Sequence, residues 1–307
     1  MKPSMSWPRG TASERAAWFC GTFTVTRVAV AWVVAPAFVA VRITGAAVGL
    51  CCDDSTFDWQ AIWLVKTPTL LFLHGMWGDA SYWNRFRRRF EGCGYRTEAI
   101  TFLHHEKPQD SSRLRHVGIM DYVAQAEQAI SALPDVPVLV GHSMGGLVAQ
   151  KLAERGLAKA MVLVAPVAPA GISVGTWSSF LCISGNLHQI VRQRPFVIKW
   201  RQSRYGLLNT LAPREMAAVH GSFVHESGRA MWEIVTGAIA VDERQVSCPV
   251  LVAVGSEDRA TPPSVVKRIA RKYDAEYREY PGWCHYLGIA WEAIDEIHDW
   301  VNARGLS

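Results

Sequence analysis

The chain has 307 residues, half of them hydrophobic, which is enough for one large α/β domain or for a domain with an appendage. The formal net charge is +5, but residues 1–52 carry +4 of it, from five basic side chains against Glu14. The rest of the chain is close to neutral, which excludes the clustered Lys and Arg face of a nucleic-acid-binding protein. The seven cysteines lack the short paired spacings of a zinc site or a secreted disulfide framework.

Residues 16–52 form an apolar segment in which Arg27 and Arg42 are the only charged side chains. The 14 residues between these arginines are fewer than the roughly 20 that a helix needs to cross a bilayer, and they suit the core of a signal peptide. If both arginines snorkel toward the interfaces, a longer stretch becomes a membrane anchor with a cytoplasmic amino terminus. A misassigned start codon is a third interpretation. We favour export or anchoring over a cytoplasmic location, and we treat residues 1–54 as an extension.

From residue 55 onward, short β-rich apolar runs alternate with amphipathic segments of helix length. The runs are 69–73, 96–102, 136–140, 161–165 and 249–254. Strands that are apolar on both faces and separated by helices predict a doubly wound α/β domain with a mostly parallel sheet over residues 55–307. Residues 166–247 interrupt the alternation with aromatic and helix-forming side chains, and so long an insertion is typical of a lid.

The run Gly141-His142-Ser143-Met144-Gly145 fits the G-x-S-x-G pattern of a nucleophile elbow. Its context strengthens this interpretation, because a buried strand is predicted to end at the motif and a helix, 147–155, to begin after it. The two glycines allow the strained turn and the close approach of the helix to neighbouring strands. We therefore expect Ser143 to be the nucleophile of a serine hydrolase.

A serine hydroxyl needs a general base that is oriented by a carboxylate, and in this architecture the chain order is Ser, then acid, then His. Glu257 and Asp258 directly follow the run 250–254, at the sheet edge where open α/β proteins build their sites. Of the ten histidines, only His285 and His298 follow these carboxylates, and His298 lies within the predicted final helix, 290–301. This leaves His285, in the loop after the predicted last strand, as the base.

The negative charge that develops on the substrate oxygen needs preorganised backbone N–H donors. The loop Leu73-His74-Gly75-Met76-Trp77-Gly78 follows the first core strand and can present the Met76 amide, while the second donor is the amide of Met144. Gly75, His74 and His142 are expected to support the loop and the elbow, with His74 structural rather than catalytic.

The run His104-His105-Glu106 offers an alternative interpretation as a metal site. Two adjacent histidines point apart on an extended segment, and no third ligand is evident. We therefore expect loop packing near the mouth of the site instead of a metal.

The run from His74-Gly75 to Trp83, the elbow at Ser143, the Asp258 loop and His285 together resemble bacterial α/β-hydrolases of the esterase and lysophospholipase-like group, over residues 67–303. The resemblance implies Asp258 rather than Glu257 as the acid, a helical cap formed by the insertion, and neither cofactor nor metal. Many relatives carry an Asp-x-x-Gly-x-Gly turn where this chain has residues 101–106. This departure bears on the expected substrate and leaves the predicted triad unchanged.

The expected function is hydrolysis of a small-molecule carboxylic ester through an acyl-enzyme on Ser143, with an apolar acyl chain or alcohol because the predicted cap is aromatic and apolar. Acyl transfer, perhydrolysis and carbon–carbon bond hydrolysis are alternatives on the same triad. An alternative of another class is a membrane-tethered binding protein that kept the fold without turnover. The expected partners are the ester and, if residues 16–52 form an anchor, a membrane.

Overall fold

The computed structural model describes residues 29–30, 39–43, 46–50 and 67–304. The chain divides into two compact units, residues 1–65 and 66–307. In the first unit, the described residues form three short antiparallel strands, β1 (Ala29–Val30), β2 (Val39–Ile43) and β3 (Ala46–Leu50). The rest of the predicted signal or anchor segment, residues 16–52, lies outside the described residues, and its role stays a prediction. Within the described ranges, no helix combines the length and the apolar character that a membrane crossing requires.

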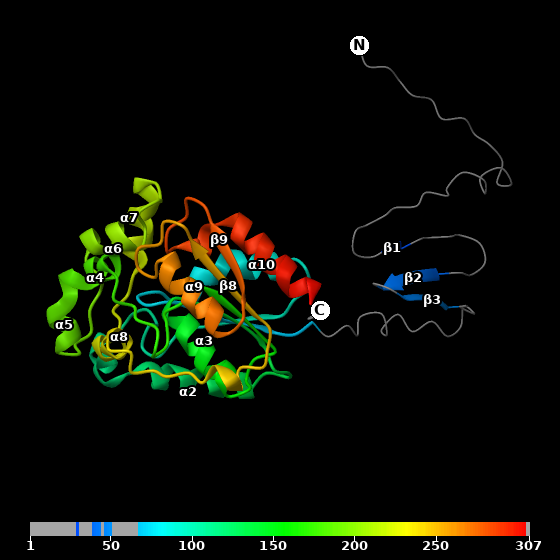
Figure 1. Cartoon of the computed structure of the whole chain (residues 1–307), viewed down its shortest axis with the longest axis horizontal. Coiled ribbons are helices and arrows are strands. Elements are labelled where there is room, and N and C mark those ends of the chain that lie inside the picture. The colour runs from blue at the N-terminus through cyan, green and yellow to red at the C-terminus, as the bar shows by residue number, and fades with distance from the viewer. Residues whose placement is uncertain (1–28, 31–38, 44–45, 51–66, 305–307) are drawn as a thin grey trace, which may run out of the picture. The chain divides into compact units, whose positions relative to one another are not determined.

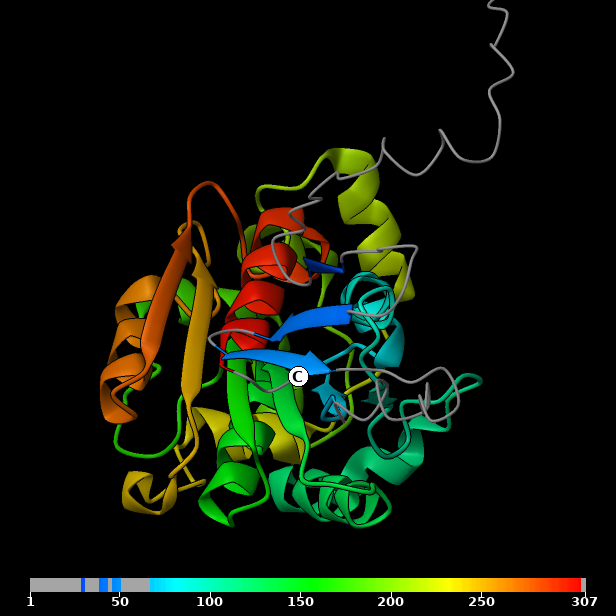
Figure 2. The same ribbon diagram turned by 90° about the vertical axis from the view of Figure 1, so that its right-hand side faces the viewer.

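The second unit is built on a sheet of six parallel strands in the order β5-β4-β6-β7-β8-β9. The strands are β4 (Leu70–Leu73), β5 (Thr97–Ile100), β6 (Val138–His142), β7 (Ala160–Val164), β8 (Val250–Gly255) and β9 (Glu276–Tyr280). Figure 2 shows β9 at one edge of the sheet beside β8. The fold prediction is confirmed, and every predicted strand is present, with ends that differ by up to two residues.

Alternate side chains of the strands point to opposite faces of the sheet, and each face is covered by its own helices (Figure 1). Leu71 and Leu73 pack in one hydrophobic cluster with α2 (Ile119–Ser131), α3 (Met144–Glu154) and α9 (Pro263–Lys272). Leu70 and Phe72 pack in a second cluster with α1 (Asn84–Glu91) and α10 (Trp291–Ala303). The sheet is therefore the apolar middle layer of three, which holds its strand ends at fixed positions.

Five helices lie between β7 and β8, and we call this part of the chain the cap. They are α4 (Trp177–Ile183), α5 (Leu187–Val191), α6 (Trp200–Gly206), α7 (Pro213–Ser222) and α8 (Gly228–Val235). Figure 1 shows α4, α5, α6 and α7 gathered at one end of the unit. A third hydrophobic cluster joins cap residues such as Phe196 and Leu208 to Trp77 of the body.

Candidate active site

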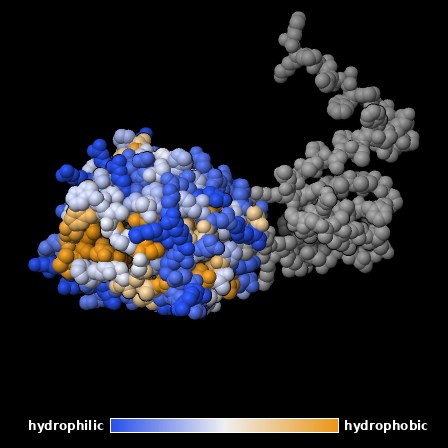
Figure 3. Space-filling view, viewed as in Figure 1, coloured by the Kyte–Doolittle hydropathy of each residue, from blue (hydrophilic) through white to orange (hydrophobic). Residues whose placement is uncertain are grey.

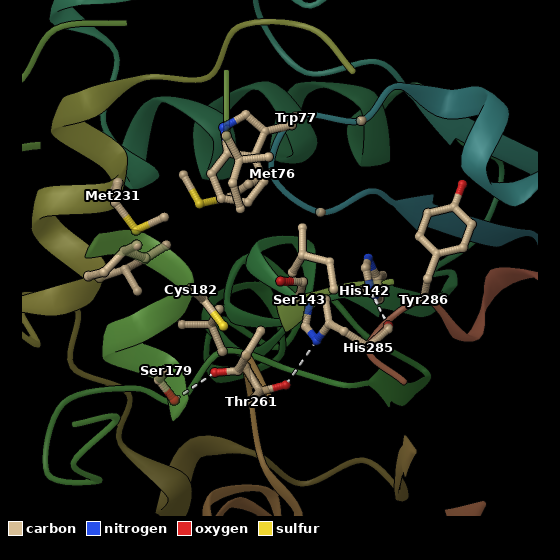
Figure 4. A pocket seen from close by; sticks show the side chains of 18 of the residues that line it. Met76, Trp77, His142, Ser143, Ser179, Cys182, Met231, Thr261, His285 and Tyr286 are labelled. Atoms are coloured by element: carbon tan, nitrogen blue, oxygen red, sulfur yellow. Dashed lines mark hydrogen bonds between the residues drawn. The ribbon is translucent and has the colours of Figure 1, made fainter. Parts of the chain in front are cut away.

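Four loops meet at the carboxyl-terminal edge of the sheet, where open α/β folds place their ligands. They follow β4, β6, β8 and β9, and they carry Gly75, Ser143, Asp258 and His285 respectively. Figure 4 shows Ser143 and His285 beside each other in the cavity that the cap covers. The sheet thus brings together residues that the sequence separates by more than two hundred positions.

Ser143 stands on the turn between β6 and α3, with φ 53° and ψ −117°. A non-glycine residue in this region is strained, and such strain persists only where the surroundings enforce it. The Ser143 N–H donates to the Val164 carbonyl at 3.0 Å, and the Ser143 carbonyl accepts from the N–H groups of Gly146 and Val167. These bonds hold the serine at the end of the strand, with its side chain on the cavity wall.

Two glycines permit the close contacts that the elbow requires. A Cβ atom on Gly145 would lie 2.2 Å from the Leu73 carbonyl oxygen, so only glycine lets α3 approach β4 so closely. A Cβ atom on Gly75 would lie 2.7 Å from Nδ1 of His142 and 2.9 Å from Cβ of Ser143. The loop after β4 therefore packs directly on the elbow.

Asp258 and His285 form a buried hydrogen-bonded pair, with 2.8 Å between Asp258 Oδ2 and His285 Nδ1. The other carboxylate oxygen, Oδ1, accepts from the backbone N–H groups of Ala260 and Thr261, each at 2.9 Å. A buried carboxylate needs such donors to offset its lost hydration. Because Asp258 orients Nδ1 of the ring, Nε2 is left to act on other groups.

The loop that carries Asp258 and the loop that carries His285 are hydrogen-bonded to each other. The Glu257 N–H donates to the Trp283 carbonyl, and the Gly282 N–H donates to the Ser256 hydroxyl, each at 2.9 Å. The Ser256 N–H donates to the carbonyl of Tyr280 at the same distance. These three bonds therefore fix the Asp258 loop relative to the His285 loop.

Thr261 is a residue of the site that the sequence did not single out. Its hydroxyl lies 3.0 Å from Asp258 Oδ2, 3.0 Å from the Ala165 carbonyl and 3.3 Å from His285 Nδ1. One hydroxyl proton serves one acceptor at a time, so Thr261 links the carboxylate, the imidazole and the end of β7 in a shared network. Its only signal in the sequence is its place three residues after Asp258.

His142, on the elbow, contacts the backbone of His285. Its Nε2 lies 3.1 Å from the His285 carbonyl, and because a carbonyl only accepts, the proton sits on Nε2. The ring stacks on Tyr82, with 4.4 Å between centroids. Burial and then the nearby His285 ring hold the pKa of His142 well below its usual value, so the ring is neutral.

His74 is buried and bonded at both ring nitrogens. Nδ1 donates to the Gly75 carbonyl at 2.7 Å, and Nε2 accepts from the Phe102 N–H at 3.0 Å. Burial, reinforced by nearby His105, lowers the pKa of His74 to about 3, so it joins two loops as a neutral ring. In the same loop Met76 borders the cavity, while Met144 opens α3 and has an N–H without an acceptor inside the helix.

His105 pairs with a carboxylate of the cap. Nε2 lies 3.1 Å from Glu226 Oε2, and both side chains are 0% exposed. No cluster of three or more potential metal-ligating side chains occurs within residues that the structure describes. The segment also turns at His104, where φ is 65°, so the expectation of an extended run was wrong.

The cavity above Ser143 has a volume of about 300 Å³, within the range of small-molecule sites. Apolar side chains of the cap and of the loop after β4 form most of its wall: Met76, Trp77, Val167, Val174, Phe180, Ile183, Ile198, Leu207, Phe223, Met231, Ile234 and Val235. Among its described lining residues Asp79 is the one carboxylate, and it pairs with Lys107 at 3.2 Å. The cavity therefore suits an apolar ligand with a reactive polar group near Ser143.

A parallel sheet covered on both faces by helices, with a serine at a strand-to-helix elbow and a histidine on the loop after the last strand, defines the class of α/β hydrolases. Residues 70–296 match the model of the alpha/beta hydrolase family. The chain belongs to this family and is a hydrolase. Comparison with curated protein sequences gave no significant match.

Solved structures with the same fold include several esterases and a lipase. An extracellular alpha/beta-hydrolase from a Paenibacillus species is 18% identical with a TM-score of 0.60, and the match covers 77% of this chain and 98% of that one. A methylesterase from Arabidopsis is 14% identical with a TM-score of 0.59, covering 76% and 99%. The monoacylglycerol lipase of Paleococcus ferrophilus is 20% identical with a TM-score of 0.57, covering 78% and 93%.

Proposed function

We propose that the protein hydrolyses carboxylic esters with an apolar acyl chain or alcohol, through an acyl-enzyme on Ser143. The observation that carries this proposal is the buried pair of Asp258 and His285, at 2.8 Å, beside a serine in a strained elbow. His285 takes the proton of Ser143 as the hydroxyl attacks the ester carbonyl, and Asp258 holds the ring in the required tautomer.

The amides of Met76 and Met144 stabilise the oxyanion of the tetrahedral intermediate. The alcohol then leaves with the proton from His285, and a water activated by the same ring hydrolyses the acyl-enzyme. The apolar cavity wall favours hydrocarbon near the reacting carbonyl. The structural neighbours include an esterase and a lipase, which is consistent with this substrate class.

We expect Ser143→Ala to lower kcat on p-nitrophenyl esters by at least about 10⁴-fold, because the nucleophile is lost while the cavity is kept. Ser131→Ala is the matched control, since Ser131 is exposed at the end of α2 and its hydroxyl contacts only its own helix. Labelling by a fluorophosphonate probe should likewise vanish only in Ser143→Ala. Full activity in Ser143→Ala would refute the proposal, and failure to label the wild type would favour a non-catalytic binding protein.

We expect kcat/KM to rise with acyl length until the cavity is filled. Each CH₂ group buried contributes about 0.8 kcal/mol, or about four-fold. A series of p-nitrophenyl esters from acetate upward measures this slope. A flat series would contradict the apolar preference without touching the role of Ser143.

A further inference from the structure

Large apolar side chains are exposed mainly on the cap. In the described residues 67–304, six of the nine exposed large hydrophobic side chains belong to it: Trp177, Phe180, Leu187, Val191, Trp200 and Trp232. Trp177 is 73% exposed and Val191 62%. Figure 3 shows hydrophobic surface gathered at the cap end of the unit. Exposed apolar side chains that cluster in this way mark an interaction surface.

The four side chains of α4 and α5 are paired along their helices. Trp177 and Phe180 are three residues apart on α4, and their rings stack with 5.6 Å between centroids. Leu187 and Val191 are four residues apart and lie on one face of α5. We call these four residues, with Arg192 and Arg194 that follow α5, the α4–α5 surface.

The segment of chain that carries this surface has charge of one sign only. Residues 177–206 contain five basic side chains and no carboxylate: Arg192, Arg194, Lys199, Arg201 and Arg204, all of them exposed. None of the five forms an ion pair with any carboxylate in the described part of the chain. Arg201 and Arg204 also border, with Trp200, a hollow of about 420 Å³ beside α6. Aromatic side chains among unpaired cations are typical of segments that lie in the headgroup region of anionic membranes. This combination therefore favours a membrane over a protein partner.

Phe180 connects this surface with the cavity. It is 43% exposed and also lines the cavity above Ser143, so it stands at the mouth. Its stacking partner Trp177 lies outside the cavity lining. An apolar molecule that enters past Phe180 therefore comes from the side where the apolar and basic residues gather.

We propose that the α4–α5 surface docks on an anionic phospholipid bilayer, with Trp177, Phe180, Leu187 and Val191 in the headgroup region and the arginines on lipid phosphates. Docking itself is independent of the chemistry at Ser143. Its consequence, that apolar esters reach the cavity from the bilayer, rests on the proposed function.

Cosedimentation of the full chain with vesicles tests the docking. We expect binding to vesicles of phosphatidylcholine mixed equally with phosphatidylglycerol, weak binding to phosphatidylcholine alone, and loss of binding as salt rises. Arg192→Glu with Arg194→Glu should lower the partition coefficient at least about ten-fold. Trp177→Ser should lower it about five-fold, because an interfacial aromatic anchor is lost.

Matched controls lie on the body of the protein. Arg88→Glu with Arg271→Glu makes the same change in net charge at exposed sites on α1 and α9. Trp291→Ser removes a tryptophan of 48% exposure from α10. These controls should bind vesicles as the wild type does, and all variants should hydrolyse a soluble short-chain ester at the wild-type rate.

Several outcomes would overturn the docking. Unchanged vesicle binding in both cap variants would place binding elsewhere in the chain. Equal binding to neutral vesicles would remove the role assigned to the arginines. Absence of vesicle binding together with a dimer that Trp177→Ser dissociates would assign the surface to a second copy of the chain. Vesicle binding by the inactive Ser143→Ala variant would show that docking does not depend on the proposed function.

Discussion

At the scale of single residues, the candidate site depends on side chains whose hydrogen bonds fix their protonation. His142 donates from Nε2 to the His285 carbonyl, and His74 donates from Nδ1 to the Gly75 carbonyl. Burial lowers the pKa of both rings, so both are neutral tautomers. Asp258 receives two backbone donors and the imidazole. The two supporting histidines therefore add no competing charge near His285.

We expect Thr261→Val to lower kcat about three- to ten-fold with little change in KM. Valine keeps the shape but removes the hydroxyl 3.0 Å from Asp258 Oδ2, and a hydrogen bond of this kind contributes about 1 kcal/mol. Steady-state kinetics on a p-nitrophenyl ester measures the effect. Thr261→Ser, which keeps the hydroxyl, should retain most of the activity. Equal loss in both variants would show that packing, rather than the hydroxyl, matters.

At the scale of elements, one buried cluster fastens the cap helix α8 to the body. Glu226, just before α8, contacts His105 and accepts from the Tyr122 hydroxyl at 2.6 Å. The His105 Nδ1 donates to the Leu103 carbonyl at 3.0 Å, so both ring nitrogens face acceptors. Burial opposes charge on this ring, but the Glu226 carboxylate and these hydrogen bonds outweigh it and raise the pKa of His105.

The same balance lowers the pKa of Glu226, because burial is outweighed by His105 and by the donors around the carboxylate. The His105 contribution to stability is complete below its usual pKa of 6.5 and is lost as pH rises through the raised value. The Glu226 contribution is complete above its usual 4.5 and is lost as pH falls through the lowered value. The pair therefore stabilises the cap contact most between these two pH values.

Glu226→Gln should reduce the free energy of unfolding by about 3 kcal/mol at pH 6, because it leaves His105 without its buried counter-charge. Urea unfolding measures the change. Glu292→Gln, at an exposed position on α10, should stay within about 0.5 kcal/mol of the wild type. If both variants unfold alike, the buried pair does not hold the cap.

At the scale of the whole molecule, the three-layer body should become less stable in acid. His74 and His142 are buried and neutral when folded, with lowered pKa values, whereas the unfolded chain binds protons on both below about pH 6.5. The free energy of unfolding should fall by up to about 1.4 kcal/mol per pH unit for each ring as pH drops from 6.5 toward 4. Urea titrations across this interval measure the slope, and a pH-independent free energy of unfolding would contradict the neutral burial of both rings.

The sequence was most informative where one local pattern decides the structure. Apolar runs predicted five of the six strands, and the predicted last strand supplied the sixth. The order of Ser143, the carboxylates and His285 placed these residues on loops that the sheet does bring to one edge. Thr261 and the His105–Glu226 pair escaped prediction, because each depends on contacts across the fold, in the latter case over 121 residues. For the adjacent histidines the sequence predicted loop packing in preference to a metal, but it could not identify Glu226, the partner of His105 that only the folded cap supplies.

The joined loops that carry Asp258 and His285 have a consequence for engineering. The bonds from the Glu257 N–H to the Trp283 carbonyl and from the Gly282 N–H to the Ser256 hydroxyl tie the two loops to each other. The cap contacts the first loop at separate points, where Ser179 Oγ donates to the Ala260 carbonyl at 2.9 Å and Asn209 Nδ2 donates to the Glu257 carbonyl at 3.0 Å. A laboratory-evolution library should therefore randomise wall positions such as Ile198, and leave residues 256–258 and 280–285 fixed. New substrate preferences can then be selected at the cavity wall, provided that Ser179 and Asn209, the cap residues that hydrogen-bond the Asp258 loop, are kept.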